Sequence, residues 1–240
     1  MQRYFVLKEL DEVVFSPDDI FHITKVMRGK IGDTLEIVDQ NQNLSLAAIA
    51  SLQPFKVEIS EKLNVNSELS NKITLYYVMA KGEKTDLVVQ KATELGVNEI
   101  VLLNSKRSVV RLENSKLIAK TIRFQKIAKE AAEQAKRLII PKVTLNPNFQ
   151  VINEIQATLR LIADEDEAGT TNKLYTLLNN LPQRESVALL VGSEGGFERE
   201  EVEYAKKVGF KTISLGKRIL RSETAAISLL AVVASYMERT

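Results

Sequence analysis

Two strand-length apolar runs in the last third of the chain constrain its fold more than any other feature. They span residues 186–191 and 211–215, are rich in Val, Ile and Leu, and each leads into a glycine-containing loop and then a helical segment. Apolar runs of this length, bounded by glycine, are typical of buried strands in a parallel sheet. Because open α/β sheets bind ligands at the carboxyl ends of their strands, we expect the two loops to lie side by side and to form the active site.

From residue 71 onward, the rest of the chain alternates between strand and helix patterns. Further strands are predicted at 73–80, 99–103 and 158–164, and helices at 84–95, 115–138, 151–155, 174–178 and 224–237. Gly96 is placed to end the first of these helices, and Pro141 to stop the second. This alternation predicts an α/β domain with a parallel sheet of five strands.

The first 70 residues are β-rich. Strand patterns at 3–7, 34–38, 44–50 and 55–65, with turn residues between them, predict a small β-barrel. Ser16 followed by Pro17 has the form of a helix start, which places His22 and Arg28 on or just after a short helix. Since residues 67–72 are polar, we divide the chain into one domain at 1–70 and a second at 71–240.

Composition excludes several kinds of chemistry. The chain has no cysteine and a single histidine, so disulfides, thiolate nucleophiles and Cys/His zinc sites are ruled out, and nothing suggests another metal site. It contains neither a Gly-x-Gly-x-x-Gly motif nor a P-loop. No apolar run reaches the ~18 residues that span a bilayer, and the N-terminus lacks the apolar core of a signal peptide. We therefore expect a cytoplasmic protein without membrane contact.

Positive charge is concentrated between residues 104 and 142. This stretch holds eleven Lys and Arg against three Asp and Glu, whereas residues 1–70 hold seven against eleven, and the whole chain carries only +2. Such a basic block is typical of a surface that binds phosphate, and a solvated helix face rich in Lys and Glu is the alternative. The block is our candidate for contact with nucleic acid.

The two loops carry the most specific motifs. The first is Val191-Gly192-Ser193-Glu194-Gly195-Gly196-Phe197, and the second is Leu215-Gly216-Lys217-Arg218-Ile219-Leu220-Arg221-Ser222-Glu223-Thr224-Ala225. Glycines let the backbone approach a ligand closely, and Ser222 or Thr224 can cap the following helix. Taken singly, the first loop has the form of an ordinary turn and the second that of a solvated helix start. The presence of both in one chain favours a ligand site.

Together, the two loops resemble the signature of the RsmE-type RNA methyltransferases of the SPOUT superfamily. The second loop matches throughout, and the first differs at Ser193, where the family usually has proline. Further matching segments lie at 22–28, 90–97 and 130–134, in the same order. The resemblance implies a parallel-sheet α/β SPOUT domain with a deep trefoil knot, a PUA-like N-terminal β-barrel that binds RNA, and a homodimer.

The resemblance also implies a cofactor, S-adenosyl-L-methionine, and the residues that bind it. One wall of its site would consist of Gly192, Glu194, Gly195 and Gly196, and the other of Leu215, Gly216, Ile219, Leu220 and Ala225. Contacts with RNA are expected from the matching motif near the N-terminus and from the basic block: His22, Lys25, Arg28, Arg107, Arg111, Arg123 and Arg137.

The reaction that the resemblance implies is methylation of uracil N3 in the decoding region of 16S rRNA, in the small ribosomal subunit. Because the N3 proton must leave, we expect a cation to stabilise the uracil oxyanion, and we assign this role to Arg221, positioned by Glu223. The target base must be unpaired or flipped out, since N3 lies on its pairing edge. Two alternatives stay open: a related SPOUT enzyme that methylates ribose or another base, and a non-catalytic rRNA-binding assembly factor.

Overall fold

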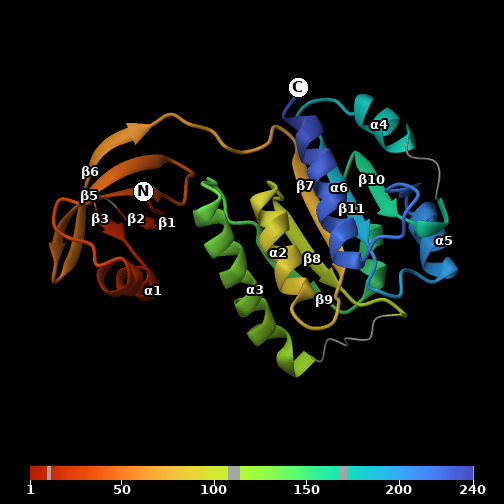
Figure 1. Cartoon of the computed structure of the whole chain (residues 1–240), viewed down its shortest axis with the longest axis horizontal. Helices are drawn as coiled ribbons and strands as arrows, with labels where there is room; N and C mark the ends of the chain where they lie inside the picture. The colour runs from red at the N-terminus through yellow and green to blue at the C-terminus, as the bar shows by residue number, and fades with distance from the viewer. Residues whose placement is uncertain (10–11, 108–113, 168–171, 240) are drawn as a thin grey trace. The chain divides into compact units, whose positions relative to one another are not determined.

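The computed structural model describes residues 1–9, 12–107, 114–167 and 172–239, and the chain forms two compact units (Figure 1). The first unit comprises Met1–Glu68 and Ala132–Ile139, and the second comprises Leu69–Ala131 and Ile140–Thr240. Each unit has its own hydrophobic core. None of the described helices is both long enough and apolar enough to cross a membrane.

The second unit is built on a six-stranded parallel sheet with the order β12-β10-β11-β7-β8-β9. Its strands are β7 (Lys72–Val78), β8 (Glu99–Leu103), β9 (Lys142–Asn146), β10 (Leu159–Ala163), β11 (Ser186–Val191) and β12 (Lys211–Ile213). The prediction of a parallel α/β sheet is confirmed, but the predicted number of five strands is wrong. The missing strand is β9, which lies at the sheet edge and is only partly buried, so its sequence contains no apolar run.

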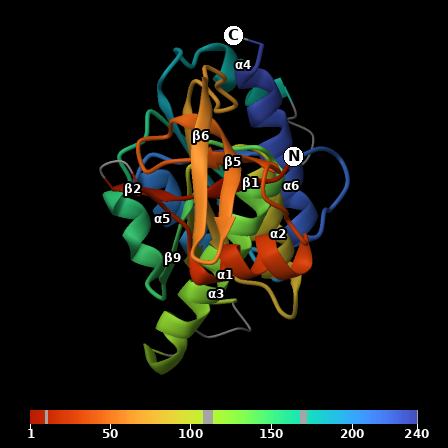
Figure 2. The same ribbon diagram turned by 90° about the vertical axis from the view of Figure 1, so that its left-hand side faces the viewer.

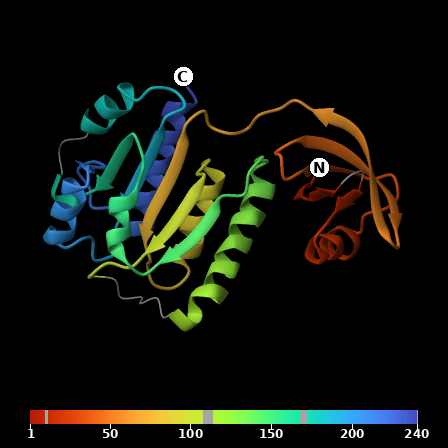
Figure 3. The same cartoon turned by 180° about the vertical axis from the view of Figure 1, so that it is seen from behind.

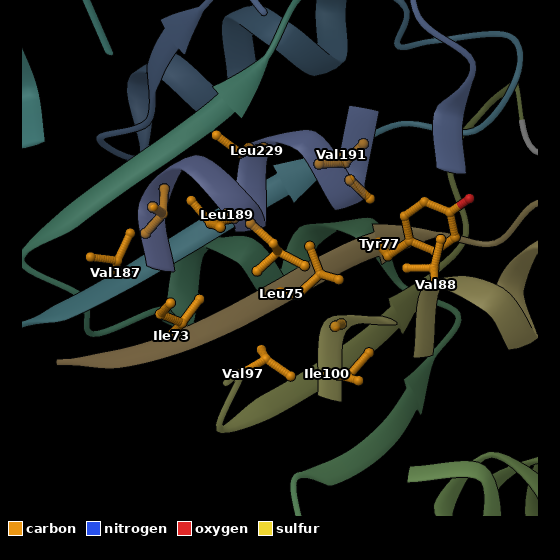
Figure 4. Close-up of a cluster of buried hydrophobic side chains, with 14 of the residues drawn as sticks. Ile73, Leu75, Tyr77, Val88, Val97, Ile100, Val187, Leu189, Val191 and Leu229 are labelled. Carbon is orange, nitrogen blue, oxygen red and sulfur yellow. The ribbon is translucent and has the colours of Figure 1, made fainter. Parts of the chain in front are cut away.

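Helices cover both faces of this sheet. On one face lie α2 (Lys84–Glu94), α3 (Asn114–Gln134), α4 (Asn172–Asn179) and α6 (Ser222–Met237), and on the other lie α5 (Arg199–Lys207) and the 3₁₀-helix η2 (Phe149–Glu154) (Figures 1 and 3). The first face packs Leu75 and Tyr77 of β7 against Leu229 of α6 (Figure 4). Because both faces are covered, the central strands are apolar on both sides, which explains their continuous apolar runs.

The long helix α3 ends at Gln134, before the predicted end at Leu138. Lys136 adopts the left-handed region, with φ of 58°. The backbone N–H groups of Lys136 and Arg137 donate to carbonyls three and five residues earlier, at 3.3 and 3.0 Å. This pair of hydrogen bonds forms a Schellman motif, so a backbone cap ends the helix well before Pro141.

The first unit contains a four-stranded sheet with the order β1-β4-β5-β6 and a separate two-stranded hairpin (Figure 2). Its strands are β1 (Arg3–Phe5), β2 (Leu7–Glu9), β3 (Glu12–Val14), β4 (Thr34–Val38), β5 (Leu44–Leu52) and β6 (Phe55–Leu63). The helix α1 (Pro17–Phe21) and the π-helix η1 (His22–Val26) connect β3 to β4, and Ser16 caps α1 as predicted. Tyr4, Ile23 and Ile49 belong to one core, which therefore joins the sheet to these helices.

Candidate functional site

A cavity of about 700 Å³ lies beyond the carboxyl ends of β7, β10, β11 and β12 in the second unit. Its walls come from residues 163–166 at the end of β10, residues 191–194 and 196–197 at the end of β11, and residues 214–222 after β12, together with Lys84, Arg107, Arg199 and Ala225. The two motif loops thus border one cavity, as predicted. This is the position at which open α/β sheets bind their ligands.

The structure places most of the predicted cofactor and catalytic residues on the cavity wall. Those that line it are Gly192, Glu194, Gly196, Leu215, Gly216, Ile219, Leu220, Arg221 and Ala225. The remaining two, Gly195 and Glu223, each lie next to a lining residue. The Gly195 carbonyl accepts a hydrogen bond from Arg107 Nη1 at 2.9 Å, and Glu223 Oε2 lies 3.9 Å from Lys84 Nζ.

A buried hydroxyl joins the two loops to the sheet. Ser222 Oγ lies 2.5 Å from the carbonyl oxygen of Gly192 and 2.9 Å from Tyr77 Oη. Burial raises the pKa of Tyr77 to about 12, so the phenol stays protonated and can donate. Because a hydroxyl has one proton, Ser222 donates to Gly192 and accepts from Tyr77.

These contacts correct the predicted capping of the last helix. Arg221 occupies the N-cap position of α6, and no side chain caps the helix there. The Ser222 hydroxyl is directed toward the loop after β11, where it finds a buried carbonyl. A buried carbonyl without a hydrogen bond costs more folding free energy than an N–H at an exposed helix end, which water can reach. The hydroxyl therefore bonds to the buried carbonyl.

Two glycines shape the first loop. Gly196 has φ of 64°, which favours glycine, and its N–H donates to the Ser193 carbonyl at 3.0 Å to close a tight turn. A Cβ on Gly192 would lie 3.2 Å from the backbone of Gly196 and from the ring of Phe197. The turn is therefore folded back on its own start, which brings its backbone to the cavity.

Lys84 connects the two loops by charge. Its ammonium group lies 2.8 Å from Glu194 Oε1 in the first loop and 3.9 Å from Glu223 Oε2 in the second. Partial burial would raise the pKa of Glu194, but the hydrogen bond and positive charge of Lys84 outweigh it, so the pKa lies below its ordinary value. Glu223 Oε2 is buried without a hydrogen bond, which leaves one acceptor near the cavity unsatisfied.

The opposite rim is held by two arginines. Arg199 pairs with Asp164 at 3.1 Å and with Asp166 at 2.8 Å, both of which follow β10. Arg107 pairs with Glu198 at 2.8 Å and donates to the first loop. Hydrogen bonding and charge from Glu198 raise the pKa of Arg107 above its ordinary value. Both guanidinium groups thus fix the loops around the cavity.

Several cavity residues lie outside the sequence motifs that predicted the site: Lys84, Asp164, Glu165, Asp166 and Arg199. The acidic segment at 164–167 directly follows a predicted strand, so its position at the sheet edge was available from the pattern. Lys84 and Arg199 had no such signal, because each is the first residue of a helix and lies outside the two motifs.

The predicted RNA contacts fall into different environments. Arg137 is 3% exposed and pairs with Glu68 at 2.5 Å, so its assignment as a backbone contact is wrong for this conformation: the guanidinium is buried in a salt bridge. Arg123 is exposed but pairs with Asp86. Arg107 lines the cavity. Arg111 lies outside the described residues.

The basic block is partly neutralised by acids from elsewhere in the chain. Among the described residues, ion pairs join Lys106 to Glu200, Arg107 to Glu198, Arg123 to Asp86, Lys136 to Glu36, and Arg137 to Glu68. The net charge of the block therefore overstates the charge that a phosphate would meet, because sequence-local counting misses partners that the fold brings near.

The other predicted RNA contacts lie on the segment after α1. His22 Nδ1 is hydrogen-bonded to Tyr4 Oη at 2.9 Å, so its ring is fixed against the core. Lys25 and Arg28 are exposed and have no ion pair with a described residue.

Among the described residues, no group of three or more His, Asp or Glu side chains is arranged to bind a metal ion.

Two family descriptions match the chain. Residues 67–234 match the RNA methyltransferase domain, and residues 15–62 match the RNA methyltransferase PUA domain. The chain is 32% identical to ribosomal RNA small subunit methyltransferase E of Bacillus subtilis, over 99% of this chain and 98% of that protein.

Two solved structures to which the chain is similar contain a bound cofactor. A methyltransferase of Legionella pneumophila, solved with SAM, is 32% identical with a TM-score of 0.86, covering 98% of this chain and 97% of that one. Ribosomal RNA small subunit methyltransferase E of Neisseria gonorrhoeae, bound to S-adenosyl methionine, is 25% identical with a TM-score of 0.84 and the same coverage.

Removing the Ser222 hydroxyl tests the link between loops and sheet. Ser222→Ala leaves both the Gly192 carbonyl and the Tyr77 hydroxyl buried without this partner, so we expect about 2 kcal/mol of destabilisation. Tyr77→Phe keeps the bond to Gly192 and should cost about 1 kcal/mol. Urea unfolding measures both, with Ser235→Ala on the exposed face of α6 as the matched control. Equal losses for Ser222→Ala and Ser235→Ala would contradict the link.

The Lys84–Glu194 pair predicts a pH-dependent contribution to stability. The folded pKa of Glu194 is lowered, so the pair stabilises the protein above the ordinary carboxyl pKa of 4.5, and this stabilisation is lost as pH falls through the folded value. Lys84→Met should therefore lose less stability than the wild type between about pH 6 and about pH 3. The urea midpoint at each pH measures this, and Lys81→Met, an exposed neighbour, is the control. Parallel pH profiles for wild type and Lys84→Met would refute the prediction.

Proposed function

The chain belongs to the family of the ribosomal RNA small subunit methyltransferases E, and from this premise we propose that it transfers a methyl group from S-adenosylmethionine to 16S rRNA of the small ribosomal subunit. One observation carries the proposal: both loops of the family signature border a single cavity at the carboxyl edge of the sheet. Within the proposal, residues 1–70 are an RNA-binding PUA-like domain, and residues 71–240 are the methyltransferase domain.

The cavity residues fit such a cofactor. Its volume of about 700 Å³ is in the range of small-molecule sites. Ser193 Oγ is buried without a hydrogen-bond partner, and Gly196 brings its backbone to the wall at a positive φ. A buried donor without a partner costs free energy, which a polar ligand group would recover. These features support a polar ligand between the two loops.

We assign cofactor binding to the residues of the two walls. They are Gly192, Glu194, Gly195 and Gly196 on one side, and Leu215, Gly216, Ile219, Leu220 and Ala225 on the other. S-adenosylmethionine supplies an activated methyl group on a sulfonium, so the protein has to hold the acceptor in line with that methyl and needs no strong nucleophile of its own. The backbone of the two glycine loops performs this positioning.

The acceptor that we propose is uracil N3 in the decoding region. Arg221 lines the cavity and is exposed without an ion pair to a described residue, so it can place its charge on an oxygen of the deprotonating base. Glu223, in the first turn of α6, has an unsatisfied buried oxygen 3.9 Å from Lys84 Nζ, and we assign it to position Arg221. Its carboxylate can also take the departing proton through a water.

Assembly and location complete the proposal. The segment after β12 returns across the sheet to the loop after β11, and α6 packs against α2 and β11. This course supports a trefoil knot in the last third of the chain. Ile227 and Ala231 of α6 are only partly buried within one chain, which supports a homodimer that covers them. The enzyme would act in the cytoplasm, where small subunits are available, without a metal or a membrane.

Primer extension tests the reaction and its position. The pure protein is incubated with S-adenosylmethionine and unmodified small ribosomal subunits, and the rRNA is reverse transcribed. Methylation at N3 blocks base pairing, so we expect one new stop at a uridine of the decoding region. Methyl incorporation without a stop would favour ribose or another base atom. Absence of incorporation, with no heat of S-adenosylmethionine binding by titration calorimetry, would favour a non-catalytic assembly factor.

Arg221→Ala tests the proposed cation. Because the guanidinium stabilises charge only as the base loses its proton, we expect kcat to fall by about 10²-fold or more while the Kd for S-adenosylmethionine stays unchanged. Single-turnover methylation and calorimetry measure the two quantities. Arg239→Ala, an exposed arginine beyond the end of α6, is the matched control. Normal turnover of Arg221→Ala would remove this residue from the mechanism.

A further inference from the structure

An unusual surface lies on the segment 21–31 of the first unit, on α1, η1 and the turn that follows (Figure 2). Four large apolar side chains on it face solvent: Phe21 is 61% exposed, Val26 57%, Met27 51% and Ile31 67%. Contiguous exposed apolar groups of this size are uncommon unless they bind a partner. We call this segment the 21–31 surface.

The backbone beneath this surface is fixed. Ile23 is 1% exposed in the core, and a Cβ on Gly29 would lie 3.1 Å from Ile49 Cδ1. The N–H groups of Met27 and Gly29 donate to the carbonyls of His22 and Ile23, each at 2.9 Å. The apolar side chains therefore point outward from an anchored segment and cannot turn inward without breaking these contacts.

Arg28 adds local strain to the same segment. Its φ of 54° lies in the left-handed region, where a side chain other than Gly, Asn or Asp is disfavoured. Strained residues of this kind persist where the surrounding structure enforces them, and they gather at functional sites. Here the strained residue is an arginine whose side chain is exposed.

The charge of the surface selects its partner. Lys25, Arg28 and Lys30 are exposed and have no ion pair with a described residue, although acids outnumber bases in the first 70 residues. An exposed aromatic ring on the same short segment as unpaired cations is an arrangement with which proteins bind single-stranded nucleic acid, because a base stacks on the ring and phosphates meet the cations. Paired bases in a duplex offer no free face to the ring.

We propose that the 21–31 surface binds an unpaired nucleotide of the RNA substrate, with its base stacked on Phe21 and its flanking phosphates at Lys25, Arg28 and Lys30. The inference rests on the proposed function, which supplies the RNA. To the RNA binding proposed for residues 1–70 it adds the kind of contact, base stacking on Phe21, and the kind of target, an unpaired base other than the one that is methylated.

The chain contains no tryptophan, which permits a direct test. Phe21→Trp places a single fluorophore on the 21–31 surface, and stacking with a base quenches its emission. Titration with a single-stranded uridine-rich oligoribonucleotide should quench the tryptophan emission. The same strand in a duplex should bind at least about tenfold more weakly. Equal quenching by both forms, or none with the single strand, would overturn the inference.

Conservative variants separate stacking from simple apolar contact. Phe21→Tyr keeps the aromatic ring and should bind the single strand as the wild type does. Phe21→Leu keeps the apolar bulk without the ring and should bind about tenfold more weakly. Leu7→Ala, which removes another exposed apolar side chain of the first unit, is the matched control. Full affinity of Phe21→Leu would point to docking of a protein and would refute base stacking.

Methylation of small ribosomal subunits distinguishes this inference from the proposed function. Phe21→Ala should raise KM for the subunit about tenfold, with kcat and the Kd for S-adenosylmethionine unchanged. If the wild type methylates subunits and Phe21→Ala does so with the same KM, the inference fails and the proposed function stands. If the wild type neither binds S-adenosylmethionine nor methylates, the proposed function fails first.

Discussion

The hydrogen bonds of the Ser222 hydroxyl hold together three segments that are far apart in the sequence. Tyr77 is the last residue but one of the central strand β7, Gly192 begins the loop after β11, and Ser222 begins α6. All three groups are buried, so each hydrogen bond replaces one that water would otherwise supply, and none can be lost cheaply. The cavity exists in this form because both of its loops are tied to the same point at the edge of the sheet.

Charge reinforces this tie from the cavity side. Lys84 approaches Glu194 in one loop and Glu223 in the other, while Arg107 and Arg199 fix the opposite rim through Glu198 and Asp164. These pairs are partly exposed, so each contributes modestly to stability. Their main effect is geometric, because they hold glycine loops that would otherwise sample many conformations. A preorganised cavity of this kind suits a reaction that depends on alignment more than on a strong catalytic group.

Local pattern predicted the parallel sheet, the helix α2 and the meeting of the two loops, because buried strands and amphipathic helices leave continuous signals in the sequence. It missed β9, whose half-exposed edge position leaves no apolar run, and it extended α3 past a backbone cap at Lys136 that no residue type announces. The wall residues came from the family resemblance, and most of them line the cavity, whereas local pattern offered Ser222 as a cap. The actual partners of Ser222 lie 30 and 145 residues away in the chain, beyond the reach of local pattern.

Local pattern also fails to predict which positive charges are free to bind RNA, because the acids that pair with them lie far away in the sequence. The sequence places most positive charge at 104–142, yet ion pairs to distant acids neutralise much of it, and Arg137 is buried. Two small groups of exposed cations have no such pair with a described residue: Lys217, Arg218 and Arg221 in the second loop, and Lys25, Arg28 and Lys30 on the 21–31 surface. An unpaired cation attracts a phosphate without first breaking an internal ion pair, so these two small groups meet RNA at a lower energetic cost than the basic block does. RNA recognition would then rest on these two groups, one at the cavity and one in the first unit. Each group combines positive charge with an exposed apolar side chain, Ile219 at the cavity and Phe21 in the first unit.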